Sequence, residues 1–413
     1  MTATTAHTPD SRYAWGRLLI SLALGTISGV GMWASVVVLP TIQVEFGVDR
    51  AGASLPYMVT TIGFALGGVF MGRLADRFGI TVPLSVGAIA LGSGFILSAL
   101  SQNFLQFLVL QAVLIGFLGS SAAFSPLVAD VSQWFLKRRG IAVAIAASGN
   151  YFAGAIWPPL MQRGIEAYGW RPVFLVIGVF CIAAMLPLAM LLRPRPVFDD
   201  RASPSSNREG LTGLLPKPPF LYPLLMLAGV ACCVAMSMPQ VHIVAYCGDL
   251  GYGVARGAEM LALMLAFGVV SRLASGFIAD HIGGAGTLLL GSFLQCLALL
   301  FYIPFDGLAS LYIVSAFFGL AQGGIVPSYA LIVRDHYPAR QAGTRIGIVL
   351  MATVLGMALG GWMSGKIFDL TGSYQAAFLN GIAFNLLNMA IAFWLVIGRH
   401  RRPASPLDRV ATA

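Results

Sequence analysis

The sequence predicts an all-α membrane protein of twelve transmembrane helices arranged in two six-helix bundles, and three observations lead to this class. First, 58% of the 413 residues are hydrophobic and only 10% are charged, whereas a soluble domain carries about 25% charged residues. Second, apolar runs long enough to cross a bilayer recur along the whole chain. Third, a polar segment divides these runs into two sets of six that share short motifs.

Each helix is assigned from an apolar run, because a helix that crosses the hydrocarbon needs about 20 such residues. Runs of this kind occur at residues 17–40, 51–72, 80–100, 104–130, 139–163, 170–192, 220–247, 257–279, 285–304, 307–333, 342–368 and 373–397. Most connections are short, but residues 193–219 form a long segment rich in Pro, Ser and charge. We therefore expect a tail at 1–16, a bundle at 17–192, a linker at 193–219, a bundle at 220–397 and a tail at 398–413.

The basic residues predict the orientation in the membrane. If both tails and the linker are cytoplasmic, 19 of the 25 Lys and Arg lie on the cytoplasmic side, five lie outside, and only Arg272 lies within a helix. Cytoplasmic loops carry such an excess in membrane proteins, so the net charge of +9 indicates topology and not a nucleic-acid partner. The N-terminus lacks the apolar core of a secretory signal, and the short loops are typical of a bacterial inner-membrane protein.

The two halves of the sequence share an internal repeat. Gly72–Gly79 reads GRLADRFG and Gly276–Gly283 reads GFIADHIG, each after the second helix of its half. Gly116 and Gly319 correspond at nearly the same spacing. A duplicated six-helix unit with a long linker is the parallel-repeat layout of transporters, in which substrate binds near the midplane between the halves.

The motif GRLADRFG resembles the G-x-x-x-D-R-x-G loop of the major facilitator superfamily, and the resemblance covers essentially the full chain. It implies a pseudo-two-fold pair of bundles, with a cytoplasmic latch that must break as the carrier opens inward. In that latch we expect Gly72 to let two helices approach and Asp76 to stabilise the positive end of a neighbouring helix. Arg77 should offer its fork to a carboxylate, with Asp130 as the candidate partner. The latch residues are thus Gly72, Asp76, Arg77 and Asp130, with Gly276 and Asp280 from the second half.

A second motif indicates the branch of this superfamily. Trp134–Gly149 reads WFLKRRGIAVAIAASG and is similar to the helix-5 signature of the monocarboxylate transporter family. Arg272 falls where that family and the related oxalate–formate antiporters have a helix-8 arginine. Gly268 stands where animal members have an aspartate, and residues 18–44 and 346–365 lack the lysines that these families place there. A single buried cation suits a monoanion better than a dianion.

We predict that Arg272 binds the carboxylate of the substrate. A charged residue in mid-helix costs about 2.5–3.5 kcal/mol on insertion scales, so a function should require it. The planar guanidinium can donate two parallel hydrogen bonds to one carboxylate. The alternative is that Arg272 pairs permanently with a carbonyl oxygen or with Asp280.

His242 is the candidate proton carrier. It follows Pro239, which should kink the helix, and imidazole titrates near neutral pH. A histidine protonated together with the bound anion would make the transported pair electroneutral. The alternative is a neutral histidine hydrogen-bonded to a helix carbonyl. The rest of the substrate site is expected from side chains in the middle of the helices, namely Met32, Trp33, Asn150, Tyr151, Gln322, Tyr329 and Trp362.

Together these patterns predict a secondary carrier, functional as a monomer, of a small monocarboxylate such as lactate or pyruvate together with a proton. The alternatives are a carboxylate exchanger of the oxalate–formate type, an efflux carrier for a larger organic molecule, and a receptor without net flux. We expect no enzyme, because the sequence shows no nucleophile–base pair or phosphate-binding loop. The five cysteines have neither disulfide nor metal-ligand spacing. No metal or cofactor is therefore expected, and a proton or substrate gradient must drive transport.

Overall fold

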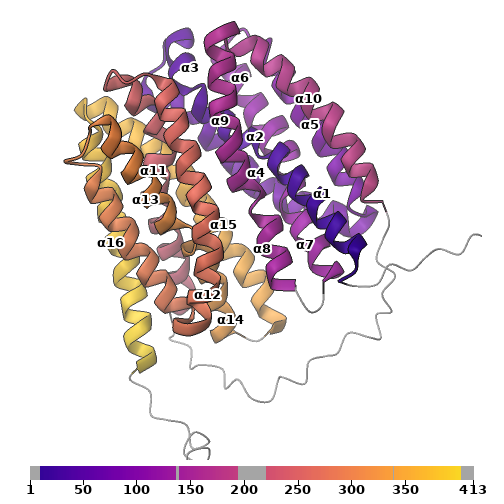
Figure 1. The fold of residues 1–413 in the computed structure, drawn as a ribbon, viewed down its shortest axis with the longest axis vertical. Coiled ribbons are helices and arrows are strands. Elements are labelled where there is room, and N and C mark those ends of the chain that lie inside the picture. Colours follow the sequence, from indigo (N-terminus) through magenta and orange to yellow (C-terminus); the bar gives the residue numbers. More distant parts are fainter. Residues whose placement is uncertain (1–9, 136–138, 194–219, 338, 401–413) are drawn as a thin grey trace, which may run out of the picture.

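The computed structural model describes residues 10–135, 139–193, 220–337 and 339–400. Within these ranges the chain is built of helices and contains no strand. The helices of the first half, indigo to magenta, lie on one side of the molecule, and those of the second half, orange to yellow, lie on the other (Figure 1). Most of the predicted linker and tails lies outside the described residues.

Several helices of the first half are interrupted. A break at Gly29 divides the first span into two helices, and the fourth span passes through a π-helical and a 3₁₀ turn. Ser11 and Asp49 cap two of the starts, because their side-chain oxygens accept the otherwise unpaired N–H groups of Ala14 and Gly52. The elements are α1 Arg12–Ser28, α2 Val30–Val37, α3 Leu39–Phe46, α4 Arg50–Phe78, α5 Thr81–Ala99, α6 Phe104–Leu110, η1 Gln111–Gly119, η2 Ser120–Ala123, α7 Ser125–Trp134, α8 Arg139–Ala147, α9 Gly149–Tyr168 and α10 Trp170–Leu191.

The second half contains longer helices. One of them joins two spans, because Gly283 has φ 78° and ψ 170°, which is not helical, and the chain turns there. Glycine adopts this backbone conformation without the steric cost that a side chain would add. The elements are α11 Leu221–Asp249, α12 Val254–Phe301, α13 Leu308–Gln322, α14 Ile325–His336, α15 Ala339–Thr371 and α16 Tyr374–His400.

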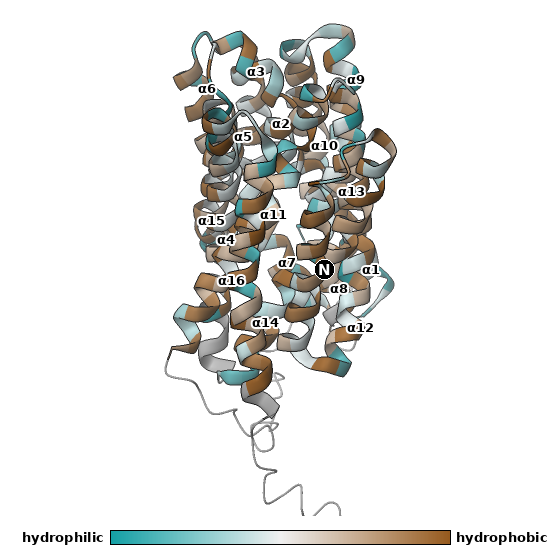
Figure 2. Cartoon of the chain, turned by 90° about the vertical axis from the view of Figure 1, so that its left-hand side faces the viewer, coloured by the Kyte–Doolittle hydropathy of each residue, from teal (hydrophilic) through white to brown (hydrophobic). Residues whose placement is uncertain are grey.

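Eleven helical stretches of the described chain are long and apolar enough to cross a membrane, and α12 supplies two spans. The predicted twelve transmembrane helices are therefore confirmed. Hydrophobic residues follow the length of the helices, and hydrophilic residues gather towards their ends (Figure 2). We call the end where α10 stops and α11 starts the linker end, and the end where α4 starts and α11 stops the far end.

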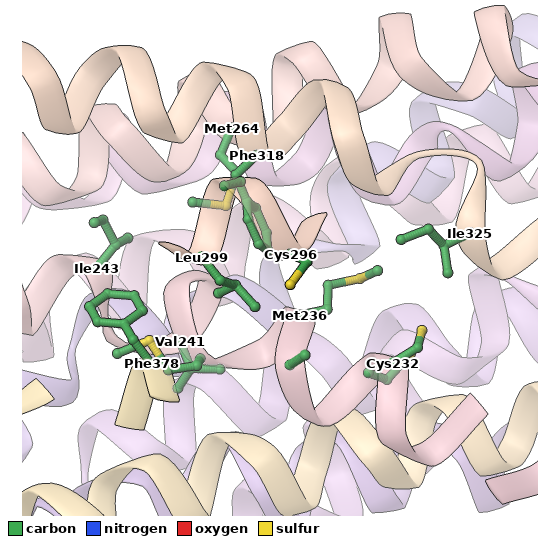
Figure 3. Packing of buried hydrophobic residues seen from close by; sticks show 14 of the residues in the cluster. Cys232, Met236, Val241, Ile243, Met264, Cys296, Leu299, Phe318, Ile325 and Phe378 are labelled. Carbon is green, nitrogen blue, oxygen red and sulfur yellow. The ribbon is translucent and has the colours of Figure 1, made fainter. Parts of the chain in front are cut away.

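Each half has its own hydrophobic core. In the first half Phe95 and Phe174 pack edge to face, with ring centroids 5.0 Å apart. In the second half Leu299 and Phe318 lie among the buried side chains shown in Figure 3. Tyr57 of α4 joins this second core, so the two halves share apolar contacts. Burial of such side chains from water provides the main packing energy outside the bilayer, but between helices in lipid close contact matters more.

In each half, a glycine at an equivalent position brings two helices of that half into direct backbone contact. A Cβ atom on Gly116 would overlap the carbonyl oxygen of Thr60 in α4, and a Cβ on Gly319 would overlap that of Met264 in α12. The partners are related by the same sequence repeat as the glycines themselves. The structure thus uses small residues for helix packing at equivalent places in both halves, as is usual in membrane bundles.

Gly116→Ala tests this packing. The added methyl group meets a backbone oxygen that cannot turn aside, so we expect the free energy of unfolding to fall by about 1–3 kcal/mol. Thermal unfolding of the purified protein in detergent measures the change. The matched control is Gly347→Ala in α15, where the described surroundings leave open space. This control should unfold at the wild-type temperature or slightly above it, and equal losses in both variants would contradict the packing argument.

Candidate substrate site between the two halves

Arg272 of α12 lies at the contact between the two halves. Its Nη1 donates a long hydrogen bond of 3.3 Å to the carbonyl oxygen of Ala147 in α8. Its Cζ lies 4.7 Å from the ring centroid of Tyr151 in α9, a cation–π contact. The Nε atom is buried and has no hydrogen-bond partner among the described residues. The guanidinium is therefore held in place by one weak bond and one aromatic face, and it keeps donors available for an anion.

Tyr151 reaches Arg272 because position 268 has no side chain. A Cβ on Gly268 would lie 2.6 Å from Cε1 of the Tyr151 ring, which is too close for two carbon atoms. The aspartate that the resembled family has at this position would displace the ring. In this chain an aromatic face occupies that space beside the arginine.

The side chain of Gln322, the last residue of α13, approaches the same place. Its Oε1 accepts a hydrogen bond from Nε2 of Gln240 in α11. Its own Nε2 lies 3.6 Å from where a Cβ on Gly268 would be. Within the part of the chain that the structure describes, this buried Nε2 has no partner. Gln240 was not predicted from the sequence, although an amide next to Pro239 in the middle of an apolar span was a usable signal.

Asn150, Met32 and Trp33 lie on the first-half side of this region. Asn150 and Met32 line a small cavity of about 20 Å³ between α1, α2, α4, η2 and α9, which is enough for about one water molecule. Trp33 is buried, and its indole N–H donates to the carbonyl oxygen of Asn150 over 3.1 Å. Trp33 therefore positions the backbone of α9, one residue before Tyr151.

Tyr329, which was also predicted to line the site, has other surroundings. The Tyr329 hydroxyl donates to Oδ1 of Asn388 over 2.8 Å, and the Asn388 amide in turn donates to Ser292. This chain of bonds runs through the interior of the second half, so Tyr329 pairs with helix α16 and not with the Arg272 group. Trp362 is half-buried on α15.

His242 is fully buried between α11 and α15. Its Nε2 lies 2.7 Å from the carbonyl oxygen of Gly361, and its Nδ1 lies 3.5 Å from the hydroxyl of Tyr374. A nitrogen this close to a carbonyl oxygen must carry the hydrogen and donate it. This is the geometry of the alternative interpretation, a histidine bonded to a helix carbonyl. The contacts place His242 with Tyr374, apart from Arg272.

The expected pair of Arg77 with Asp130 is not formed. Asp130 at the linker end accepts two hydrogen bonds from Arg17 of α1, at 2.7 and 2.8 Å, and both side chains are buried. Arg17 also lies 4.8 Å above the ring of Trp134. Arg77 is exposed and lies 5.2 Å from the ring of its neighbour Phe78. Arg17 bonds the carboxylate of Asp130 because α1 and α7 pack together, whereas the guanidinium of Arg77 lies against the ring of Phe78.

The other predicted latch residues also lie at the linker end. Asp76 and Asp280 are exposed, and Arg272 does not pair with Asp280. A Cβ atom added to Gly72 or to Gly276 would have no atom of a neighbouring described residue within 4 Å. The expectation that Gly72 lets two helices approach is therefore wrong for this conformation, in which no described neighbour packs against that face.

At the far end, charged groups join the two halves. Nη2 of Arg50 at the start of α4 lies 2.9 and 3.0 Å from the carboxylate oxygens of Asp249 at the end of α11. Asp369 near the end of α15 accepts the backbone N–H groups of Arg50 and Ala51, at 2.8 and 2.7 Å. A carboxylate at a helix N-terminus is favourable because it accepts unpaired N–H groups and opposes the helix dipole. These contacts between the two halves were not predicted from the sequence.

Comparison with known proteins places this geometry in a family. The family model described as "Major Facilitator Superfamily" matches residues 22–344 and 287–412. Monocarboxylate transporter 13 of Bos taurus is 25% identical, over 94% of this chain and 91% of its own length. Agnestins efflux protein AgnL12 of Paecilomyces divaricatus is 23% identical, over 93% and 88%. Among the described residues, no three His, Cys, Asp or Glu side chains gather as metal ligands would.

A solved structure has the same fold. The bacterial homologue of the human lysosomal transporter Spinster, in an inward-facing and occupied conformation, superposes with a TM-score of 0.70 at 16% identity, covering 96% of this chain and 100% of the other. The family model covers well over half of the sequence, and the spans, the repeat and the fold agree with it. The chain is an integral membrane transporter, not an enzyme, that resembles the monocarboxylate transporters and belongs to the major facilitator superfamily.

Proposed function

We propose that this chain is a secondary carrier of a short monocarboxylate of the lactate or pyruvate type, working by alternating access with a co-transported proton. The observation that supports the proposal most is the Arg272 guanidinium, which lies between the halves with a buried Nε that has no partner in the described chain. A carboxylate fits such a planar guanidinium, because its two oxygens can accept two parallel N–H hydrogen bonds.

Arg272 bridges the two halves, and this position gives substrate binding a mechanical consequence. Its weak bond to Ala147 and its contact with Tyr151 both cross from α12 to α8 and α9. A bound carboxylate would compete for the same donors and would cancel the charge at the interface. The empty and loaded carriers would then differ in the free energy of bringing the halves together, which is what alternating access requires.

The names of relatives favour the same cargo. Curated relatives at 25–26% identity include monocarboxylate transporters 11 and 13 of several mammals. Others are named as efflux proteins or as transporters of the major facilitator type. An efflux carrier for a larger organic molecule is therefore the second candidate, and the uptake experiment below separates the two.

The remaining parts of the proposal concern direction and energy. We propose that the linker end faces the cytoplasm of a bacterial inner membrane, since most Lys and Arg lie on that side. The far end is closed by Arg50, Asp249 and Asp369, so the site would open towards the linker end in this conformation. A proton or substrate gradient would drive a monomeric carrier without a cofactor.

Uptake of labelled lactate into proteoliposomes tests the proposed function. With an inside-alkaline pH step we expect accumulation above the equilibrium level, because proton and anion move together. Uptake that appears only when the vesicles contain another carboxylate would identify an exchanger. Wild-type protein that moves no short monocarboxylate under either condition would contradict the proposal and favour the efflux interpretation.

Arg272→Lys and Arg272→Ala test the anion site. Lysine keeps the charge but loses the bidentate fork, so we expect about tenfold slower lactate uptake at low concentration. Alanine should lower it about a hundredfold, since a charge-assisted bidentate bond is lost. The control is Arg256→Lys, an exposed arginine that pairs with Glu259 on its own helix, and it should transport normally. If Arg272→Ala took up lactate at the wild-type rate, the guanidinium would not be part of the anion site.

His242→Gln separates the two interpretations of this histidine. The glutamine amide can still donate to the carbonyl oxygen of Gly361 but does not titrate. Given the fixed bond in the structure, we expect this variant to keep pH-driven accumulation, whereas His242→Ala should mainly lower the thermal stability. Loss of accumulation in His242→Gln with lactate exchange intact would instead identify His242 as the proton carrier.

A further inference from the structure

We infer that Gln322, held by Gln240, binds an oxygen on C2 of the substrate, so that the carrier prefers 2-hydroxy and 2-oxo monocarboxylates to unsubstituted ones. This inference rests on the proposed function and adds the chemistry of the second carbon. It starts from Nε2 of Gln322, a second buried donor in the region around Gly268 that has no partner among the residues the structure describes.

The hydrogen bond between the two glutamines fixes the direction of the Gln322 amide. Gln240 donates its Nε2 to Oε1 of Gln322, so the oxygen side of the Gln322 amide is occupied. The other side must then present N–H groups. Gln322 is completely buried and Gln240 is 3% exposed, so neither side chain turns freely into water. The pair thus forms a rigid amide that offers a donor and no free acceptor on this side.

That donor lies close to the Arg272 group. Nε2 of Gln322 is 3.6 Å, and Cε1 of Tyr151 is 2.6 Å, from the same point, the Cβ position of Gly268. The guanidinium of Arg272 lies over the ring of Tyr151. The chain after Gln322 also touches α12 at this level, since a Cβ on Gly323 would lie 2.5 Å from the backbone nitrogen of Arg272. Guanidinium, aromatic ring and amide therefore surround one small region.

Two buried donors without partners in one region indicate a missing acceptor. A buried donor left unpaired keeps its full desolvation cost, and most buried polar groups in proteins are paired. Arg272 Nε and Gln322 Nε2 both lack a partner in the described chain. A carboxylate would satisfy the first, and an oxygen on the adjacent carbon of the same small molecule would satisfy the second.

The same argument gives the selectivity. A hydroxyl or keto oxygen at C2 accepts a hydrogen bond from the Gln322 amide. The CH₂ group of propionate cannot, so it leaves this amide without a partner and shielded from water. Sites that bond a substrate oxygen reject analogues without it strongly, because the buried partner then stays unsatisfied. We expect lactate to bind at least about tenfold more tightly than propionate, which corresponds to one buried hydrogen bond.

Competition measurements in proteoliposomes test this inference. Uptake of labelled lactate is inhibited by unlabelled lactate or propionate, and the two half-inhibitory concentrations are compared. Wild-type protein should need at least about ten times more propionate. In Gln322→Leu and in Gln322→Met, which keeps the length of the side chain, the ratio should fall to about two or less, mainly because lactate binds less tightly.

The matched control is Gln295→Leu. Gln295 is as fully buried in the second half, but its amide donates to the carbonyl oxygen of Cys232, so this variant should keep the wild-type ratio. A wild-type ratio near one, or an unchanged ratio in both Gln322 variants, would overturn the role of Gln322 and leave the carboxylate proposal intact. If wild-type protein takes up neither acid, the proposed function itself fails.

Discussion

The structure depends on one constraint, that a polar group inside the hydrocarbon layer must find its partner within the protein. Many buried Ser and Thr hydroxyls obey it by bonding a carbonyl oxygen of their own helix, and several larger polar side chains obey it in pairs that join two helices. Arg17 bonds Asp130 at two atoms, and Tyr329 bonds Asn388 within the second half. Each such pair ties two helices together, because each partner would be costly alone. Arg272 and Gln322 depart from this pattern in the candidate site, because Nε of Arg272 and Nε2 of Gln322 have no partner among the described residues.

The pairs also divide into those within one half and those between halves. Arg17 with Asp130 and Tyr329 with Asn388 hold helices of the same half together, and nothing in a rocking motion needs to break them. Arg50 with Asp249, and Asp369 with the start of α4, join opposite halves at the far end. Opening the far end would therefore require these last contacts to separate, with their groups exposed to water, where charges are well solvated. Their position at an end of the molecule keeps that cost small.

Much of the fold could be predicted from the sequence, because hydrophobic length and the positions of glycine act locally. The twelve spans followed from apolar runs, and the turn at Gly283 falls at the end of the repeated motif. Tyr151, Gln322 and Arg272 were expected at the substrate site, and the structure brings them to one region. The partner of a given buried charged side chain was harder to predict. The carboxylate of Asp130 bonds Arg17 and not Arg77, and no local sequence pattern encodes which of these two arginines, on different helices, packs beside it.

Glycine at position 268, where the resembled family has an aspartate, would let one arginine serve as the proposed anion site. An aspartate one turn before Arg272 would lie within reach of the guanidinium and would neutralise it whenever the site was empty. Gly268 instead admits the ring of Tyr151, whose face stabilises the cation but carries no net charge. The positive charge therefore stays available, and under the proposed function the substrate itself supplies the neutralising carboxylate. Under this proposal, binding of the anion and neutralisation of the interface are one event, and a single side chain couples cargo to the contact between the halves.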